Sequence, residues 1–120
     1  MGEVRVTALI GPNNDDVQAV DLVVDTGAFL TILPPSICDQ LGLTFPIKHR
    51  VVLADDRRLD IDVGIAFIKL DGRQGGILVG RMNAPMAFLG VSALESLGFK
   101  VNPVEGTLEP TRPFPETPLL

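Results

Sequence analysis

Hydrophobic residues recur at every second position near the start of the chain. Val4, Val6, Ala8 and Ile10 are apolar in this way, which is typical of a strand with one buried face. Turn-forming residues at 11–16 then predict a reversal, and residues 17–24 predict the return strand. Because the end of that strand is apolar on both faces, we expect it to be buried on both sides.

Short apolar segments separated by turns continue to residue 109. They predict strands over residues 51–53, 59–61, 63–70, 75–80, 86–89, 99–101 and 107–108. Two short helices are expected between them. One begins at Pro34-Pro35-Ser36 and ends at Gly42; the other begins at Ser92, with Glu95 in a capping box, and ends at Gly98. The pattern therefore indicates a mostly β protein with one or two short helices.

One strand–helix unit occurs twice. Residues 36–43 match residues 92–99 in pattern, and each copy follows an apolar strand and ends in Leu-Gly. A duplicated half-barrel would produce this match. Chance would also produce it, because serine starts and glycine stops are common in helices.

Composition limits the classes of function. A chain of 120 residues with 46% hydrophobic residues suits one folded domain. A net charge of −5, with no Trp, no Tyr and no basic run, argues against nucleic-acid binding. The apolar runs are too short to span a membrane. Because no signal peptide is visible, we expect a cytoplasmic protein.

Cysteine and histidine are each present once. A lone Cys38 excludes an intrachain disulfide, and with only His49 beside it no structural zinc site can form from one chain. We expect Cys38 to be a buried small hydrophobe and His49 to be a solvated surface residue.

The tripeptide Asp25-Thr26-Gly27 is the candidate site. It places an ionisable side chain directly after a buried strand, where an isolated carboxylate costs several kcal/mol or has a raised pKa. Gly27 allows a sharp turn and a close approach, and Thr26 can hydrogen-bond neighbouring backbone. A plain turn remains the alternative. The apolar residues that resume after Ala28 argue against an exposed turn.

With these residues the chain resembles the retropepsin-like aspartic proteases, the single-domain homologues of pepsin lobes. The family pattern of apolar residues, Asp-Thr-Gly-Ala, two further residues, Thr or Ser and an apolar residue is found over residues 23–32. The second family signature, two apolar residues and a glycine before a helix, is Phe88-Leu89-Gly90. The resemblance covers residues 4–109.

This resemblance implies a closed, barrel-like acid-protease fold with a flap hairpin. The flap corresponds to residues 51–61, and its substrate-binding tip to Leu53, Ala54, Asp55, Asp56 and Arg57. Residues 1–109 would form the protease domain. The Pro-rich residues 110–120 would form an extended or disordered tail.

The resemblance also implies a homodimeric aspartic endopeptidase. Each chain carries one Asp-Thr-Gly, so Asp25 and its mate from a second copy would form a dyad that shares a proton and activates a water. Thr26 would hold the site rigid, Gly27 would allow close substrate approach, and Ala28 completes the motif. The implied partners are a second copy and a peptide or protein substrate, and the mechanism needs no metal or cofactor.

The flap tip departs from the family, whose tips are usually glycine-rich. Asp56 stands where a glycine would ease a tight turn, although aspartate tolerates the left-handed region. Two other functions therefore remain open. One is a catalytically silent homodimer that binds peptides or assembles something, and the other is a monomeric β domain in which Asp25 is an ordinary turn residue.

Overall fold

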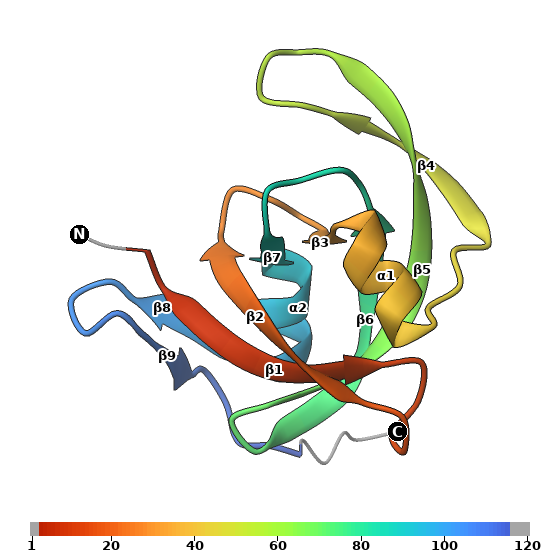
Figure 1. Ribbon diagram of the computed structural model, residues 1–120. Coiled ribbons are helices and arrows are strands. Elements are labelled where there is room, and N and C mark those ends of the chain that lie inside the picture. Colours follow the sequence, from red (N-terminus) through yellow and green to blue (C-terminus); the bar gives the residue numbers. More distant parts are fainter. Residues whose placement is uncertain (1–2, 116–120) are drawn as a thin grey trace, which may run out of the picture.

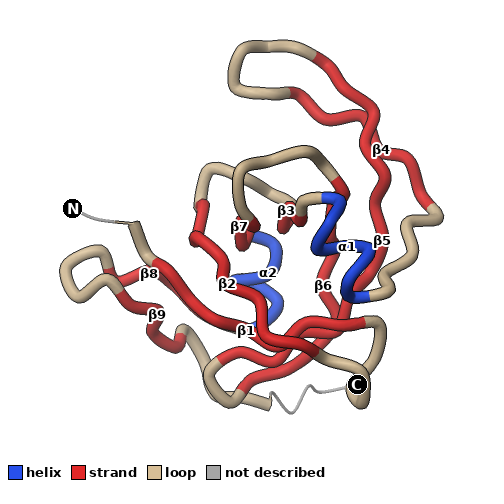
Figure 2. The backbone as a smooth tube through the Cα atoms, in the orientation of Figure 1, coloured by secondary structure: helices blue, strands red, loops and turns tan. Residues whose placement is uncertain are grey.

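Nine strands and two short helices make up residues 3–115, which the computed structural model describes (Figures 1 and 2). In chain order they are β1 (Arg5–Gly11), β2 (Gln18–Asp25), β3 (Thr31–Leu33), α1 (Pro35–Leu41), β4 (Ile47–Val52), β5 (Arg58–Leu70), β6 (Arg73–Arg81), β7 (Ala87–Gly90), α2 (Val91–Leu97), β8 (Phe99–Asn102) and β9 (Thr107–Pro110). None of these helices is long and apolar enough to cross a membrane.

Six strands close into a barrel, as the predicted fold class requires. Their order is β1-β2-β7-β3-β6-β5, and β5 pairs back with β1. β4 extends the sheet on the free side of β5, and β8 and β9 form a separate pair. The pairs β2·β7 and β3·β6 are parallel, so each joins segments that are far apart in the sequence. The barrel therefore brings the ends of β2, β3 and β7 together.

The period-two pattern of the first strand is confirmed, and the end of the second is buried on both faces at Leu22 and Val23, as predicted. Ala8 lies opposite Val20 in the antiparallel register of β1 and β2, and both side chains are buried. Ile10 and Leu22 are also buried, whereas Thr7 and Asp21 face solvent and hydrogen-bond each other at 2.6 Å. One face of this hairpin therefore belongs to the core.

The core fills the barrel and extends to both helices. It includes Leu33, Cys38 and Leu41 around α1, and Leu94 and Leu97 on α2. Cys38 is buried as predicted, its thiol donates to the Leu33 carbonyl at 3.5 Å, and burial raises its pKa. Both helices thus close the barrel by apolar packing.

The sequence predicted three of the four helix ends. α1 begins at Pro35, after Pro34, as expected. Gly42 and Gly98 end the two helices in the left-handed conformation, as predicted. The predicted capping box of α2 is wrong. The N-cap is Gly90, with no side-chain cap, and Ser92 lies inside the first turn. Its hydroxyl donates instead to the carbonyl of Phe29.

The flap hairpin is longer than predicted. The sequence predicts two strands at 59–61 and 63–70, but β5 runs without a break through Asp62. Asp62 does not end the strand because its backbone pairs with Lys48 on β4 and with Arg81 on β6. The register of β4 with β5 extends back to Ile47, opposite Val63. The hairpin therefore rises as one long arm above the barrel (Figure 1).

The last described residues lie against α2. β9 extends to Pro110, and residues 111–115 follow the end of α2. Residues 116–120 of the predicted tail lie outside the described residues. The domain boundary at residue 109 stays a prediction.

Candidate functional site

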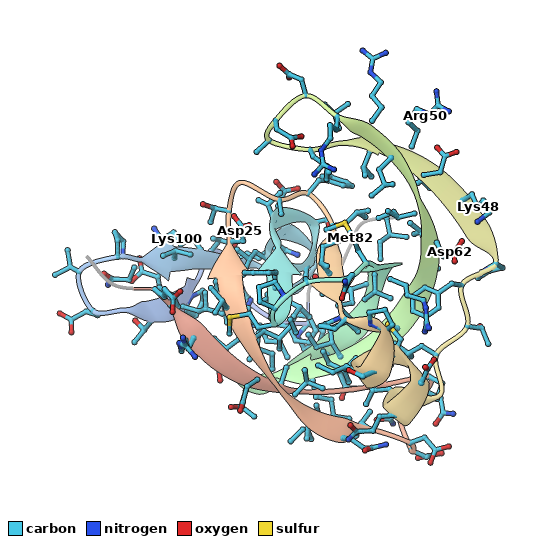
Figure 3. All side chains as sticks on the ribbon, turned by 45° about the horizontal axis from the view of Figure 1, so that its top comes forward. Asp25, Lys48, Arg50, Asp62, Met82 and Lys100 are labelled. Carbon is cyan, nitrogen blue, oxygen red and sulfur yellow. The ribbon has the colours of Figure 1, made fainter. Side chains whose placement is uncertain are left out.

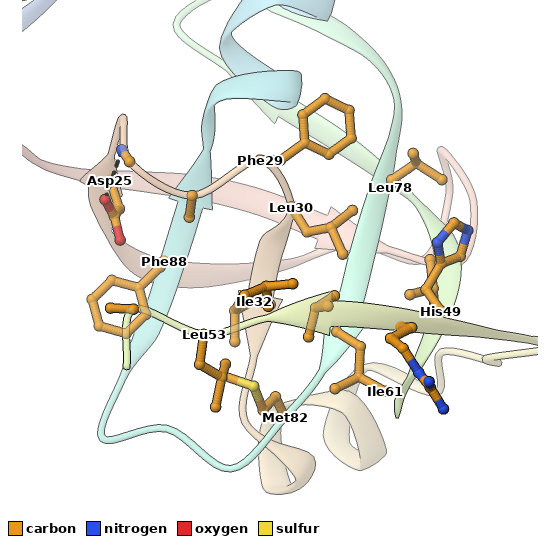
Figure 4. Close-up of a pocket in the computed structure, with 17 residues that line it drawn as sticks. Asp25, Phe29, Leu30, Ile32, His49, Leu53, Ile61, Leu78, Met82 and Phe88 are labelled. Carbon is orange, nitrogen blue, oxygen red and sulfur yellow. Dashed lines mark hydrogen bonds between the residues drawn. The ribbon is translucent and has the colours of Figure 1, made fainter. Parts of the chain in front are cut away.

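Asp25 is the last residue of β2 and lies at the open end of the barrel. Its neighbours Leu22 and Val23 are buried, whereas Asp25 is only partly buried. Its Oδ1 accepts the backbone N–H of Gly27 at 3.0 Å, and its carbonyl accepts the N–H of Ala28 at 3.2 Å. These bonds turn the chain sharply and hold the carboxyl group in one orientation (Figure 4).

The residues that follow Asp25, 26–30, form a segment that we call the Asp25 loop. The first turn of α2 holds it in place. The N–H groups of Val91 and Ser92 donate to the carbonyls of Ala28 and Phe29 at 2.8 and 3.1 Å. The hydroxyl of Ser92 donates to the Phe29 carbonyl as well. The loop is thus anchored by backbone donors that a helix start leaves free.

The second predicted signature lies directly behind this loop. β7 runs parallel to β2, with Val23 opposite Phe88 and Asp25 opposite Gly90. Phe88 is half-buried and lines the groove, whereas Leu89 points into the core. The fold therefore brings Phe88, Leu89 and Gly90 to the candidate site, although they are remote from Asp25 in the sequence.

Thr31, the Thr of the family pattern over residues 23–32, is a supporting residue that the predicted site residues do not include. It is fully buried and is the one buried polar side chain in residues 3–115. Its Oγ1 accepts the N–H of Gly90 at 3.1 Å and so ties β3 to β7 below the Asp25 loop. The available signal was a hydroxyl within the apolar run from Phe29 to Leu33. Such a residue needs a buried partner.

A groove of about 630 Å³ lies between the Asp25 loop and the flap (Figure 4). Its lining is mainly apolar, with Asp25 at one side. The lining residues include Gly27, Ala28, Phe29, Leu30, Ile32, Val51, Leu53, Ala54, Ile61, Leu78, Met82 and Phe88. Such a surface suits apolar side chains of a ligand.

The flap tip is a tight turn that only partly reaches this groove. The N–H of Leu53 donates to the Arg57 carbonyl at 2.8 Å, and Asp56 adopts a left-handed conformation with φ 67°. Leu53 and Ala54 line the groove. Asp55, Asp56 and Arg57 are exposed and do not line it; the Asp55 carboxylate accepts from Arg57 Nε at 2.6 Å. Of the five predicted substrate-binding residues at the tip, two therefore line the groove and three face solvent.

The two faces of the flap differ in chemistry. On one face, Lys48 pairs with Asp62 at 2.8 Å (Figure 3). Arg50 pairs with Asp60 at 3.1 Å on this face and also borders the groove. The hydrogen bond to Asp62 raises the pKa of Lys48. The other face carries Val51, Ile61 and also His49, which lines the groove. His49 is exposed, as the sequence predicted. Its place beside the groove was not predicted, because residues 47–50 were not expected to be part of a strand whose alternate side chains face the groove.

Thr26 and Gly27 form the exposed edge of the site. Within residues 3–115 the Thr26 side chain has no hydrogen-bond partner. The described residues also contain no cluster of three or more His, Cys, Asp or Glu side chains that could hold a metal ion. Among the described residues, Asp25 supplies the one carboxyl group of the groove, which His49 and Arg50 line from the flap.

The comparisons with known proteins agree with this architecture. No protein-family model matches the chain, and no curated protein matches it. Among solved structures it is similar to the EIAV protease in complex with the inhibitor HBY-793, with 21% sequence identity and a TM-score of 0.61 over 84% of this chain and 93% of that one. At this identity the likeness establishes the fold: the closed barrel with its flap and two short helices is retropepsin-like.

Proposed function

We propose that this protein is an aspartic endopeptidase that acts as a homodimer. The observation that carries the proposal is the position of Asp25, which lies at the edge of an apolar groove, under a flap, on a loop held by α2. A rigid scaffold below and a hairpin above are what peptide hydrolysis requires, because the substrate must be oriented and water excluded.

The chemistry follows from pairing two Asp25 side chains. Two carboxyl groups a few Å apart cannot both ionise, so they share one proton. The ionised member takes a proton from a bound water, and the protonated member polarises the substrate carbonyl. The attacking water adds its oxygen to the carbonyl carbon, and the amide nitrogen leaves with a proton. Each copy supplies one carboxyl, so activity depends on dimerisation.

The exposed edge of the site supports the dimer. Thr26 and Gly27 are exposed beside Asp25, and Thr26 has no partner within the described residues. In a dimer with two-fold symmetry, the same surface of each subunit forms the interface, so the Thr26 and Gly27 edge of one copy would contact the same edge of the other. We infer that Thr26 contacts the second copy and holds the two Asp25 loops in register.

The groove indicates the form of the substrate. Its apolar lining suits bulky apolar side chains, and the flap edge offers backbone groups to an extended peptide. We propose a peptide or unfolded protein segment with apolar residues at the cleaved bond.

The experiment is cleavage of a diverse peptide mixture from about pH 4 to 7, read by mass spectrometry, with Asp25→Asn beside the wild type. The amide side chain of this variant would keep an oxygen for the Gly27 N–H, so the variant should fold. Asp21→Asn is the matched control, because Asp21 lies on the same strand and outside the groove. Loss of all cuts in the Asp25 variant alone supports the proposal; cuts that persist in it contradict the mechanism.

A catalytically silent peptide-binding homodimer is the second candidate. The exposed acidic flap tip favours it, since Asp55 and Asp56 replace the small residues that would close tightly over a peptide. A folded dimer in sedimentation that binds peptides but cuts none of them would support this function. A stable monomer at high concentration would contradict both.

A further inference from the structure

α2 has seven residues, so most of its backbone polar groups lie in its first or last turn. The N–H groups of its first turn and the carbonyls of its last turn have no partners within the helix, apart from the Gly98 N–H that caps the carbonyls of Leu94 and Glu95. An isolated helix of this length is marginal in water. The partners of its two ends therefore determine which parts of the protein α2 connects.

The first turn of α2 is bonded to the Asp25 loop. The N–H groups of Val91 and Ser92 donate to the carbonyls of Ala28 and Phe29. A shift of the helix along its axis would stretch these bonds and release the loop behind Asp25.

The last turn of α2 is bonded to two arginine side chains. Arg73, at the start of β6, donates from Nη1 to the carbonyls of Leu97 and Gly98 at 2.9 and 3.1 Å. Arg112 donates from Nη2 to the carbonyls of Glu95 and Ser96 at 2.8 and 3.0 Å. Cations at this end of a helix also complement its dipole.

The segment that carries Arg112 is itself fastened to the fold. We call residues 111–115 the C-terminal strap. The Thr111 N–H donates to the Gly98 carbonyl at 2.8 Å, and the Arg112 carbonyl accepts from Arg73 Nη2 at 2.7 Å. The Arg73 guanidinium lies 5.0 Å from the ring centre of Phe99 and 5.4 Å from that of Phe114. Arg73 thus joins barrel, helix and strap.

We propose that the C-terminal strap positions the Asp25 loop through α2, with Arg112 as the positioning residue. The helix is about 10 Å long and transmits the position of its last turn to its first. Removing the Arg112 bonds lets α2 loosen from its C-terminal end, and the bonds to Ala28 and Phe29 weaken with it. The consequence for catalysis rests on the proposed function, but the loosening of the loop does not.

Hydrogen exchange on the full chain tests the coupling without any substrate. In Arg112→Ala we expect the amides of Val91 and Ser92 to exchange about tenfold faster, since bonds to a charged donor have been lost at the other end of the helix. Lys100→Ala is the control. Lys100 lies on β8, near the strap in the chain, but its ammonium group pairs with Glu109 on β9 at 3.4 Å and not with α2. Faster exchange in the last turn alone, or an equal effect in the control, would overturn the proposal.

Two further variants protect the test from a folding failure. Arg112→Lys keeps the charge but loses the forked donor, so exchange should lie between wild type and Arg112→Ala. Phe114→Leu removes the ring over Arg73 and should loosen the same amides. Unchanged exchange at Val91 and Ser92 in both folded variants would contradict the proposal.

Peptide cleavage then tests the consequence for the site. Arg112→Ala should lower kcat by about tenfold with KM unchanged, because Arg112 does not line the groove and acts on the loop alone. Sedimentation should still show the wild-type oligomer. If the wild type cuts no peptide, the proposed function fails, while the exchange result still tests the coupling. If the variant loses kcat because its oligomer dissociates, and the Val91 amide exchanges at the wild-type rate, the coupling is overturned.

Discussion

Asp25 lies directly opposite Gly90 in the parallel pairing of β2 and β7. The Gly90 N–H donates to Thr31 Oγ1, and the Asp25 loop passes so close behind Gly90 that an added Cβ would lie 2.4 Å from the Leu30 carbonyl carbon and oxygen. Gly90 therefore allows the loop to approach the end of β7. The position of the candidate catalytic carboxyl depends on this contact.

Gly90→Ala should destabilise the protein, because the Leu30 backbone cannot move aside as a flexible side chain would. We expect a loss of about 2 kcal/mol or more in the free energy of unfolding, measured in urea. Gly75→Ala on β6 is the matched control, since a Cβ there meets nothing within 4 Å. Equal stability of the two variants would contradict the close approach.

Thr31→Val should leave the Gly90 N–H without a partner inside the protein. A buried donor without an acceptor costs about 1–3 kcal/mol, whereas the side-chain volume hardly changes. Thr31→Ser keeps the hydroxyl and should retain more stability. Urea unfolding of both variants measures the difference; a valine variant as stable as the serine variant would show that this hydrogen bond contributes little.

Asp56→Gly should relieve the left-handed backbone at the flap tip, while Asp56→Val should strain it. A non-glycine residue in this region costs about 1–2 kcal/mol, and a β-branched one has no local hydrogen bond to offset the cost. We expect amides of the hairpin tip to exchange faster in the valine variant and no faster in the glycine variant. If the proposed function holds, KM should rise in the valine variant alone.

The contact between Asp39 and Arg81 should depend on pH. The Arg81 guanidinium, 2.7 Å away, lowers the pKa of Asp39 from its ordinary value of 3.8. A carboxyl with a lowered folded pKa stabilises the protein above its unfolded pKa and loses that contribution as the pH falls through the folded one. Asp39→Asn should therefore be less stable than wild type at neutral pH, and only slightly so because Asp39 is exposed. The difference should disappear in acid; a difference that persists there would point to another cause.

The sequence predicted those features that depend on neighbouring residues. Gly42 and Gly98 end their helices in the left-handed conformation, which glycine adopts without steric cost. These helix ends could be predicted because they need no contact with a distant residue. The alternation in β1 predicted its buried face, the apolar run at the end of β2 predicted burial on both sides, and the Asp-Thr-Gly motif indicated the place of the candidate site. The left-handed conformation of Asp56 agrees with the tight turn that the sequence predicts at this tip.

Ser92 and His49 show where prediction from the sequence failed. Ser92 has the right spacing for a helix cap, but its hydroxyl bonds to Phe29, which is 63 residues earlier in the chain. His49 looked like an isolated surface residue, and only the register of β4 with β5 places it beside Ile61 at the groove. Both depend on partners that local spacing does not specify.

By itself, the sequence determined the mostly β pattern, the two helix stops and the hairpin with its charged tip, because these follow from alternation and turn chemistry over a few residues. The motif around Asp25 carried the resemblance that implied a flap at this hairpin. Tertiary structure decided the rest. Barrel closure placed Gly90 opposite Asp25, buried Thr31 beneath the loop and set Arg73 and Arg112 on the last turn of α2. Such contacts join residues far apart in the chain, and they form only when burial of the shared core brings their strands together.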